Sequence, residues 1–516
     1  MQKVSVSQKG SPLVLSGIAL LILAVGGGIF LGIPALQAVI LSWKDYRPVQ
    51  GLLGSPWVGL KNYQTLFSSP YFWRIVKNSL IFWFFGSVLP VLAGGALGFV
   101  LSRKAAGRKA AAFLACWLLP VFLPELLYAY LAILGFGAEF LTVPAMARLV
   151  TLVMSGFRVF CFAVFLSGIG GLTGKTRGFS PGKAALLGTG AVLALVLARA
   201  FTSSNLNFLL QNPLTYETMD TLDNYCFRQG LYNMAVGAST AGWVSKWMMQ
   251  LPGLLLGAVL LIVLMKKQTA APRQEGEKGG SAPAVAAGVI ICAVVLAGWI
   301  FLLSLQPGFL KPIIWLQSLV NSLFAAVISC VLFAVLLGAL LLACYRFPVV
   351  GVCLGLFFSS LLNNWMAGYL FYRELSLYNT LLGTALWTCW NGVLLLVPLS
   401  VIGGVFDGKN IGLSAWLRRM LPFFLLFFGL FAALSWGGWM EDMILISGGD
   451  NRTLPLLLQA WMVSGVNPNQ AVSAAGEGLS GGITNLLLVY SLVPLLIGGA
   501  CVTLFGFLFP KEETAS

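Results

Sequence analysis

Long apolar stretches recur along the whole chain and are separated by short polar segments. A helix needs about 20 predominantly apolar residues to cross a bilayer, and twelve stretches come near that length. They lie near residues 12–42, 79–102, 111–136, 146–170, 184–204, 243–265, 283–306, 319–344, 349–371, 380–403, 421–437 and 484–509. The pattern predicts an all-α polytopic membrane protein with about twelve transmembrane helices.

The polar segments predict the orientation of these spans. Loops that carry Lys and Arg face the cytoplasm in most membrane proteins. In the twelve-span scheme the basic clusters fall on one side, so both termini are expected to be cytoplasmic. The first stretch is too long for a signal-peptide core, and we expect it to remain as a span. The clusters are Arg103, Lys104, Arg108 and Lys109; Lys175, Arg177 and Lys183; Lys266 and Lys267; and Lys409, Arg418 and Arg419.

Composition narrows the function classes. Apolar residues make up 59% of the 516 residues and charged residues only 9%, so most of the chain cannot be the surface of a soluble globule. The excess of 31 Lys and Arg over 16 Asp and Glu fits the basic loops and does not indicate nucleic-acid binding. Histidine is absent, which excludes zinc sites and catalytic triads built on it. The nine cysteines are scattered singly and are interpreted as packing residues.

The two parts of the chain resemble each other. Asn78, Ser79 and Leu80 open the second span, and Asn321, Ser322 and Leu323 open the eighth. Likewise LSGIGGLTGKTRGFS (166–180) aligns with LSVIGGVFDGKNIGLS (399–414). Since six spans separate equivalent points, the halves have the same orientation. We expect two parallel six-helix units, 1–265 and 283–516, joined by a polar, Gly-rich cytoplasmic linker at 266–282.

Several stretches resemble the membrane subunits of maltose-type, binding-protein-dependent carbohydrate ABC importers. They are SPWVGLKNYQTLFSSPYFWRIVKNSL (55–80), NPLTYETMDTLDNYCFRQGLYNMAVGASTAGW (212–243) and, more weakly, SWGGWMEDMIL (435–445) with TLPLLLQ (453–459). The resemblance implies two type I ABC permease units fused in one chain, in the plasma membrane of a bacterium. It also implies two kinds of partner: cytoplasmic ABC ATPase subunits, and an extracellular solute-binding protein that delivers a carbohydrate. No GxxxxGK loop followed by Ser or Thr occurs, so the chain needs no cofactor of its own and ATP would be bound by the partner subunits.

The family couples to its ATPases through a loop with a Glu-Ala-Ala signature followed by Asp-Gly and Leu-Pro. In the second half Asp407 and Gly408 match the Asp-Gly, and Leu421 and Pro422 the Leu-Pro. The Glu-Ala-Ala position holds no acid in either half, so both loops are degenerate. Arg418 and Arg419 could contact the ATPase, or they could anchor the next span at lipid headgroups. The coupling candidates are Ile402, Gly403, Gly404, Asp407, Gly408, Arg418, Arg419, Gly170, Gly171 and Gly174.

Carbohydrate sites combine aromatic faces with amides and carboxylates that bind hydroxyl groups. Candidates for a substrate pathway in the outer half of the spans are Asn363, Asn364, Trp365, Trp436, Trp439, Asn205 and Asn207. An ordinary aromatic belt at the membrane interface would give the same pattern. Arg158 and Arg199 fall within predicted spans, where they could line the pathway or extend to the interface.

We expect no enzyme activity and no metal site in this chain. The function that fits best is the permease component of an ABC importer for a sugar or oligosaccharide. Two alternatives remain open at this point. The chain could be a degenerate permease that senses or scaffolds without transporting, or a membrane-embedded enzyme acting on a glycan.

Overall fold

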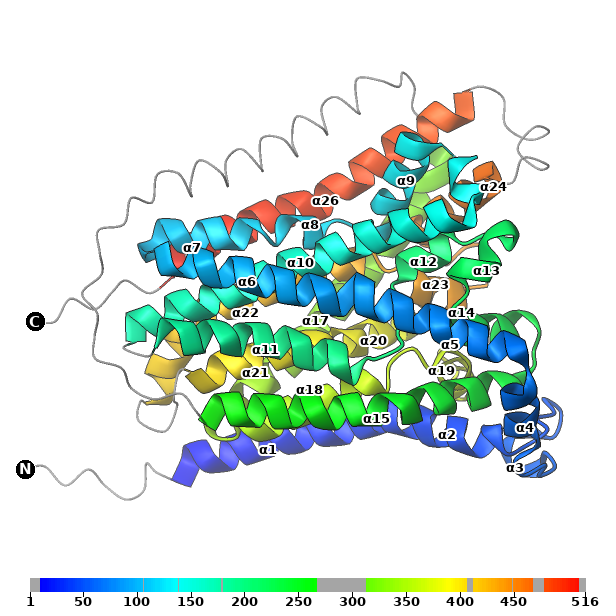
Figure 1. Ribbon diagram of the computed structural model, residues 1–516, viewed down its shortest axis with the longest axis horizontal. Coiled ribbons are helices and arrows are strands. Elements are labelled where there is room, and N and C mark those ends of the chain that lie inside the picture. The colour runs from blue at the N-terminus through cyan, green and yellow to red at the C-terminus, as the bar shows by residue number, and fades with distance from the viewer. Residues whose placement is uncertain are drawn as a thin grey trace, which may run out of the picture.

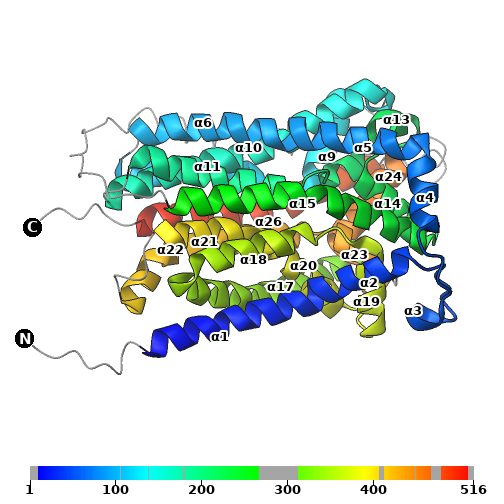
Figure 2. The same cartoon turned by 60° about the horizontal axis from the view of Figure 1, so that its bottom comes forward.

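The computed structural model describes residues 10–104, 106–137, 139–177, 180–266, 312–405, 412–447, 449–466 and 478–509. These residues form an all-α bundle whose main helices run nearly parallel to the long axis of the molecule (Figures 1 and 2). The linker beyond Lys266 and the predicted span at 283–306 lie outside the described residues.

The first segment, residues 10–266, begins with the helix run Pro12–Ser42, in which a π-helical turn at Gly28–Gly32 joins the first two α-helices. Its helices are α1 (Gly10–Gly27), α2 (Ile33–Ser42), α3 (Gly51–Gly54), α4 (Lys61–Ser68), α5 (Pro70–Trp83), α6 (Leu89–Lys104), α7 (Gly107–Cys116), α8 (Leu119–Phe122), α9 (Glu125–Phe136), α10 (Pro144–Arg177), α11 (Pro181–Ala198), α12 (Asn205–Leu210), α13 (Tyr216–Met219), α14 (Leu222–Phe227) and α15 (Val236–Lys266).

The second segment, residues 312–509, repeats this order of long and broken helices. Its helices are α17 (Pro312–Arg346), α18 (Pro348–Ser360), α19 (Trp365–Glu374), α20 (Leu381–Asn391), α21 (Leu396–Val405), α22 (Leu413–Trp436), α23 (Met440–Leu445), α24 (Leu454–Val466) and α26 (Gly478–Leu508). α1 begins and α26 ends at the same end of the bundle, which we call the termini end (Figure 1).

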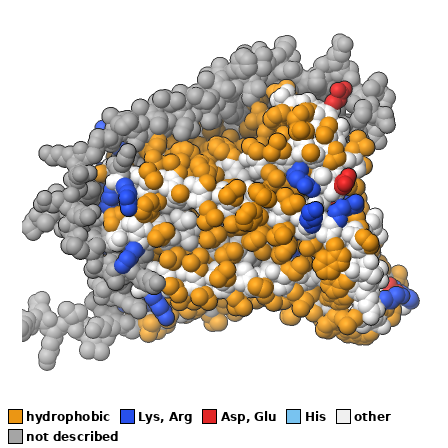
Figure 3. All heavy atoms as spheres, viewed as in Figure 1, with side chains coloured by type: hydrophobic (Ala, Val, Ile, Leu, Met, Phe, Trp, Pro, Cys, Tyr) orange, Lys and Arg blue, Asp and Glu red, His pale blue; other side chains and the backbone are white. Residues whose placement is uncertain are grey.

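Nine helices or helix runs among the described residues are long and apolar enough to cross a membrane, and the bent pair α18–α19 makes up to ten. The chain is therefore an all-α, multi-pass membrane protein. On the visible face hydrophobic side chains cover the middle, whereas charged side chains lie toward the two ends (Figure 3). This is the distribution that a bilayer around the bundle requires.

Two predicted spans are broken rather than continuous. The stretch 111–136 forms α7, α8 and α9, because Pro120 and Pro124 lack the N–H that a helix interior needs and Pro124 holds Leu123 in an extended conformation. The stretch 349–371 forms α18 and α19, which meet at 96°. No proline lies at that bend; Asn363 instead takes a left-handed conformation with φ of 62°.

The repeated Asn-Ser pair makes matching contacts in the two segments. Asn78 donates from Nδ2 to the carbonyl oxygens of Glu217 and Asp220, both at 3.0 Å. Ser79 Oγ accepts a hydrogen bond from the main-chain N–H of Leu222 at 2.8 Å. Each contact ties the first half of the helix run Pro70–Arg103 to a segment far along the chain.

In the second segment Asn321 donates from Nδ2 to the carbonyl oxygens of Asp450 and Arg452, at 2.7 and 3.0 Å. Ser322 Oγ accepts from the N–H of Leu454 at 2.7 Å. The sequence repeat thus marks the same local structure twice.

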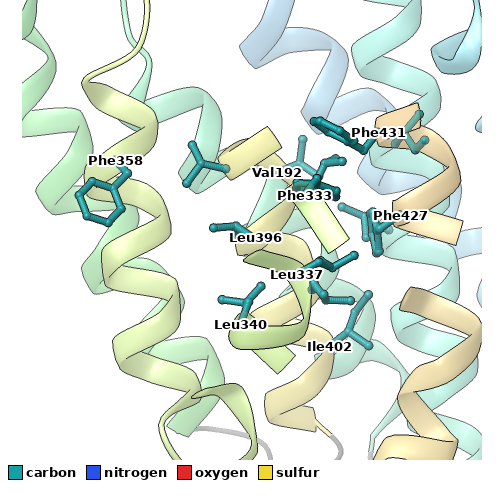
Figure 4. Packing of buried hydrophobic residues seen from close by; sticks show 14 of the residues in the cluster. Val192, Phe333, Leu337, Leu340, Phe358, Leu396, Ile402, Phe427 and Phe431 are labelled. Atoms are coloured by element: carbon teal, nitrogen blue, oxygen red, sulfur yellow. The ribbon is translucent and has the colours of Figure 1, made fainter. Parts of the chain in front are cut away.

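The two segments interlock. α1 packs against α17, α15 against α18, and α26 against α7, so helices of each segment lie on helices of the other. A large apolar cluster that contains Phe333, Phe427 and Phe431 runs through the interior (Figure 4). The rings of Phe333 and Phe431 stack with centroids 3.8 Å apart.

Glycines allow close helix contacts within the first segment. A Cβ added to Gly94 or Gly98 of α6 would lie 2.4 or 2.5 Å from a carbonyl oxygen of α10, and one added to Gly188 of α11 would lie 2.1 Å from Leu166 O. Small residues at such crossings are typical of helix packing in membranes.

Candidate functional site

A cavity of about 290 Å³ lies between the two segments. Its wall includes the break between α8 and α9, the middle of α10, the loop after α11, the break between α18 and α19, and the region from α22 to α23. Apolar side chains form much of the wall. The ionisable and amide side chains in it are those of Glu125, Arg158, Arg199, Asn205, Asn363, Asn391 and Glu441.

Both broken helices contribute to this cavity at membrane depth. A helix rises 1.5 Å per residue, so the 13 residues of α18 span only about 20 Å of a hydrocarbon core that is about 30 Å thick. Non-helical backbone at that depth is tolerated only where it is buried in protein or lines a water-filled cavity. Interrupted helices at corresponding positions of two repeats are also the best structural indicator of a transport site.

Glu125 and Arg158 form an ion pair in the wall. Glu125, the first residue of α9, accepts a hydrogen bond from Arg158 Nη1 at 2.9 Å and another from Ser204 Oγ at 3.4 Å. The guanidinium of Arg158 also lies 5.4 Å from the ring centroid of Tyr128. The pair joins α9 to α10 beside the break.

Arg199 follows the last residue of α11 and donates from Nη2 to Asn363 Oδ1 at 3.3 Å, a contact between the two segments. Glu441 accepts a hydrogen bond from Asn391. Glu441 lies on the short helix α23, outside the candidate spans, and burial raises the pKa of its carboxyl to about 7. Part of this group is therefore uncharged near neutral pH.

A second layer of charged groups holds the loops around the cavity. Lys246 pairs with Asp223, which also accepts from the main-chain N–H of Ser203 at 3.0 Å. Asp220 pairs with Arg228 at 2.7 Å. Burial raises the pKa of the Asp220 carboxyl, and the hydrogen bond and charge of Arg228 act in the opposite direction. Among the described residues no group of Cys, Asp and Glu could hold a metal ion.

Two curated proteins share stretches of sequence with this chain. Over 46 residues it is 41% identical to the polygalacturonan/rhamnogalacturonan transport system permease protein YteP of Bacillus subtilis, which covers 9% of this chain and 14% of the relative. Over 113 residues it is 27% identical to the diacetylchitobiose uptake system permease protein DasB of Streptomyces coelicolor, which covers 21% and 34%. Over these stretches the chain is similar to permease proteins of saccharide transport and uptake systems. Both relatives are transport permeases rather than enzymes.

The matched stretches span about a third or less of each relative's length. No family model matches the chain. Two crystal structures of a bacterial alginate ABC transporter, one with an alginate-bound periplasmic protein, share 18% identity with it at TM-scores of 0.34 and 0.36. They cover 41% and 46% of this chain and 85% and 91% of their own chains. At these values the likeness supports no further comparison.

The structure brings together four of the seven residues predicted for the substrate pathway: Asn205, Asn363, Trp365 and Trp439 line the cavity. The other three lie elsewhere. Trp436 stacks on Tyr490 and donates to its carbonyl oxygen at 3.0 Å, Asn364 donates to Pro34 O at 3.0 Å, and Asn207 donates to Met219 O at 2.9 Å. These three make structural contacts outside the cavity.

The predicted coupling residues of the first half do not form a loop. Gly170, Gly171 and Gly174 lie inside α10, where nothing in the sequence interrupts the helix before Arg177. A Cβ at Gly170 would lie 2.6 Å from Ala184 O, and one at Gly174 would lie 2.8 Å from Ala184 Cβ. These glycines let α10 pack closely against α11.

In the second half Ile402, Gly403 and Gly404 lie in α21. A Cβ at Gly404 would lie 2.8 Å from Met265 Cε. Asp407 and Gly408 lie outside the described residues. Arg418 and Arg419 lie near the start of α22 at the termini end, with Arg418 exposed.

Three polar groups of the cavity, Glu125, Asn391 and Glu441, were not singled out from the sequence. Glu125 carried a usable signal, since it is the one charged residue in the apolar stretch 111–136, and an ionisable residue inside a membrane indicates a functional site. Glu441 gave no such signal, because it follows the end of its span.

Proposed function

We propose that this chain is the transmembrane permease of a carbohydrate ABC importer and that the cavity is its substrate site. The observation that carries the proposal is the position of the cavity. It lies between the interlocked segments, and the breaks in two helices, one from each segment, form part of its wall. The sequence similarity to sugar permeases adds the substrate class.

The proposal includes two permease units in one chain, residues 1–265 and 283–516, joined by the linker 266–282. The matching hydrogen bonds of Asn78 and Asn321 support this division, because each ties a long helix run to a later part of its own segment. The units interlock through α1, α15 and α26, so we propose that they act as a fused heterodimer around one pathway.

The chain would use ATP hydrolysed by separate cytoplasmic subunits and would receive its substrate from an extracellular solute-binding protein. The ATPase contact is proposed for the termini end, where Arg418 is exposed at the start of α22. The termini are proposed to be cytoplasmic because the basic clusters lie with them.

Deletion and complementation in the native host test this function. A deletion strain should lose uptake of one oligosaccharide from a labelled panel, and the wild-type chain should restore it. Purification of the tagged chain from native membranes should recover an ATPase and a solute-binding protein. If uptake of every saccharide survives deletion although both proteins are recovered, the chain is not a transporting permease and a sensor or scaffold remains.

A further inference from the structure

The cavity wall is rich in hydrogen-bond donors that have no partner. Four buried nitrogen atoms in lining side chains find no hydrogen-bond acceptor in the protein: Arg158 Nε, Arg199 Nη1, Trp365 Nε1 and Trp439 Nε1. The two tryptophan side chains are almost completely buried, with 4% and 2% of their surface exposed. Buried donors are nearly always satisfied by protein, water or ligand, so these four are groups to which a ligand with acceptor atoms could be hydrogen-bonded.

Three acceptor side chains in the same wall already have donors. Glu125 accepts from Arg158 and Ser204, Glu441 accepts from Asn391, and Asn363 Oδ1 accepts from Arg199. None of the buried side-chain acceptors that lack a partner among the described residues lines this cavity. The unpartnered buried side-chain groups of the wall are therefore all donors, and a ligand with acceptor atoms would complement them.

The positive charge in the cavity wall also favours a ligand with acceptor atoms. Arg199 forms no ion pair with any residue that the structure describes. Asp223, which favours the charged form of Arg199 through space, is bound by Lys246 and by the N–H of Ser203. Arg158 is neutralised by Glu125, so Arg199 is the cation in the wall whose charge is not matched by a contacting acid.

We infer that the cavity takes an acidic saccharide and that Arg199 receives the carboxylate of a uronic acid unit. This inference rests on the proposed permease function and adds the substrate class. An arginine–carboxylate contact is charge-assisted and directional, which suits recognition of one ring substituent. The indole N–H groups of Trp365 and Trp439 are left to meet hydroxyl or carboxylate oxygens.

Glu441 is compatible with an anionic ligand. Its carboxyl has no cationic partner among the described residues, and burial raises its pKa to about 7. A protonated carboxyl does not repel a carboxylate and can donate a hydrogen bond to it. The cavity volume of about 290 Å³ suits a short saccharide unit, since ligand sites begin at about 300 Å³.

The test compares one saccharide with and without its charge. Purified full-length protein in lipid nanodiscs is titrated with trigalacturonic acid and with its carboxamide, in which each carboxylate becomes a neutral amide of similar size. We expect the acid to bind at least tenfold more tightly. Arg199→Gln should weaken the acid by about 10- to 100-fold, as expected for loss of one charge-assisted hydrogen-bonded contact, and should leave the amide nearly unchanged.

Arg373→Gln is the matched control, because it removes an exposed arginine at the end of α19 that does not line the cavity. It should keep the preference for the acid. Equal binding of acid and amide, or a preference that survives Arg199→Gln, overturns the acidic class. If only the amide binds, the acidic class is overturned, but the permease proposal is not. Failure of both probes to bind a cooperatively melting protein overturns the inference, while the uptake assay in the native host decides the permease proposal separately.

Discussion

Lys246 of α15 forms an ion pair with Asp223 of α14, and the two side chains are only 1% and 3% exposed. The same carboxylate accepts from the N–H of Ser203, in the loop that carries Arg199 and Ser204 into the cavity wall. A buried charge pair is costly to form but more costly to break, because the remaining charge stays buried alone. This pair therefore positions one wall of the cavity.

Asp223→Ala should lower the free energy of unfolding by about 3–5 kcal/mol, because it leaves Lys246 buried without a counter-charge. The double variant Asp223→Ala, Lys246→Met should recover much of this loss. Thermal melting of the purified protein in detergent measures both. Asp45→Ala breaks the exposed pair with Arg47 and should change stability by less than about 1 kcal/mol. If Asp223→Ala is as stable as Asp45→Ala, Lys246 is not buried as a charged group.

Trp439→Phe should weaken substrate binding without a large loss of stability, because it keeps the aromatic ring of a cavity-lining residue and removes an N–H that has no hydrogen-bond partner in the protein. Trp436→Phe is the matched control. It removes a donor that is bonded to Tyr490 O, so it should cost about 1 kcal/mol of stability and leave binding unchanged. Saccharide titration measures the effect on binding, and melting curves measure the effect on stability. Weaker binding by Trp436→Phe with normal binding by Trp439→Phe would place the site around Trp436.

Gly170→Ala should destabilise the contact of α10 with α11, because the new Cβ would lie 2.6 Å from Ala184 O. Overpacking of this kind costs about 1–3 kcal/mol. Gly338→Ala is the same change on α17, where a Cβ meets nothing within 4 Å, and should be silent. If Gly170→Ala melts normally but loses its ATPase partner, Gly170 couples to the ATPase rather than serving packing alone.

Binding of an acidic saccharide should weaken as pH rises from 6 to 8. The pKa of Glu441 is about 7, so this carboxyl is mostly neutral below that pH and mostly charged above it, where it would repel a carboxylate ligand. Glu125, Arg158 and Arg199 are the other ionisable groups that line the cavity. Asp442, next to Glu441, does not line it, but burial raises its pKa to about 7 as well. Glu441→Gln should therefore lose most of the pH dependence, and the part that remains would come from Asp442. A wild-type affinity that does not change would exclude Glu441 as the titrating group.

The orientation can be tested by labelling single cysteines in a cysteine-free background. Val49, between α2 and α3, is 99% exposed at the end opposite the termini end, and Gly412 is exposed at the start of α22. Val49→Cys should react with an impermeant maleimide in intact cells, and Gly412→Cys only after permeabilisation. Labelling of Gly412→Cys in intact cells would place the termini outside.

Hydropathy was sufficient to predict the multi-pass helical fold, because span length is set by the membrane and not by tertiary contacts. It failed at the two broken helices, where apolar character continues through the breaks at Leu123 and Leu361 while the backbone turns. In the sequence, only Pro124 indicates the first break and only Asn363 the second.

The candidate site was predicted in part for a related reason. Trp365, Trp439, Asn205 and Asn363 were found because aromatic and amide residues near span ends are conspicuous. Trp436 has the same character, yet its ring faces Tyr490. Which side of a helix faces a cavity depends on the packing of segments distant in the sequence, and span boundaries alone cannot give it.

In the proposed permease, the stack of Phe333 on Phe431 would help to separate the two sides of the membrane. Phe431 lines the cavity, and the apolar cluster continues from it toward the termini end. Exposing a buried Phe costs about 1.5–3 kcal/mol, so parting both rings costs about 3–6 kcal/mol. Spontaneous opening is then rarer by roughly 10²- to 10⁴-fold. An idle copy would consequently leak few protons or sodium ions, and a cell could keep many copies in its membrane without draining its ion gradients.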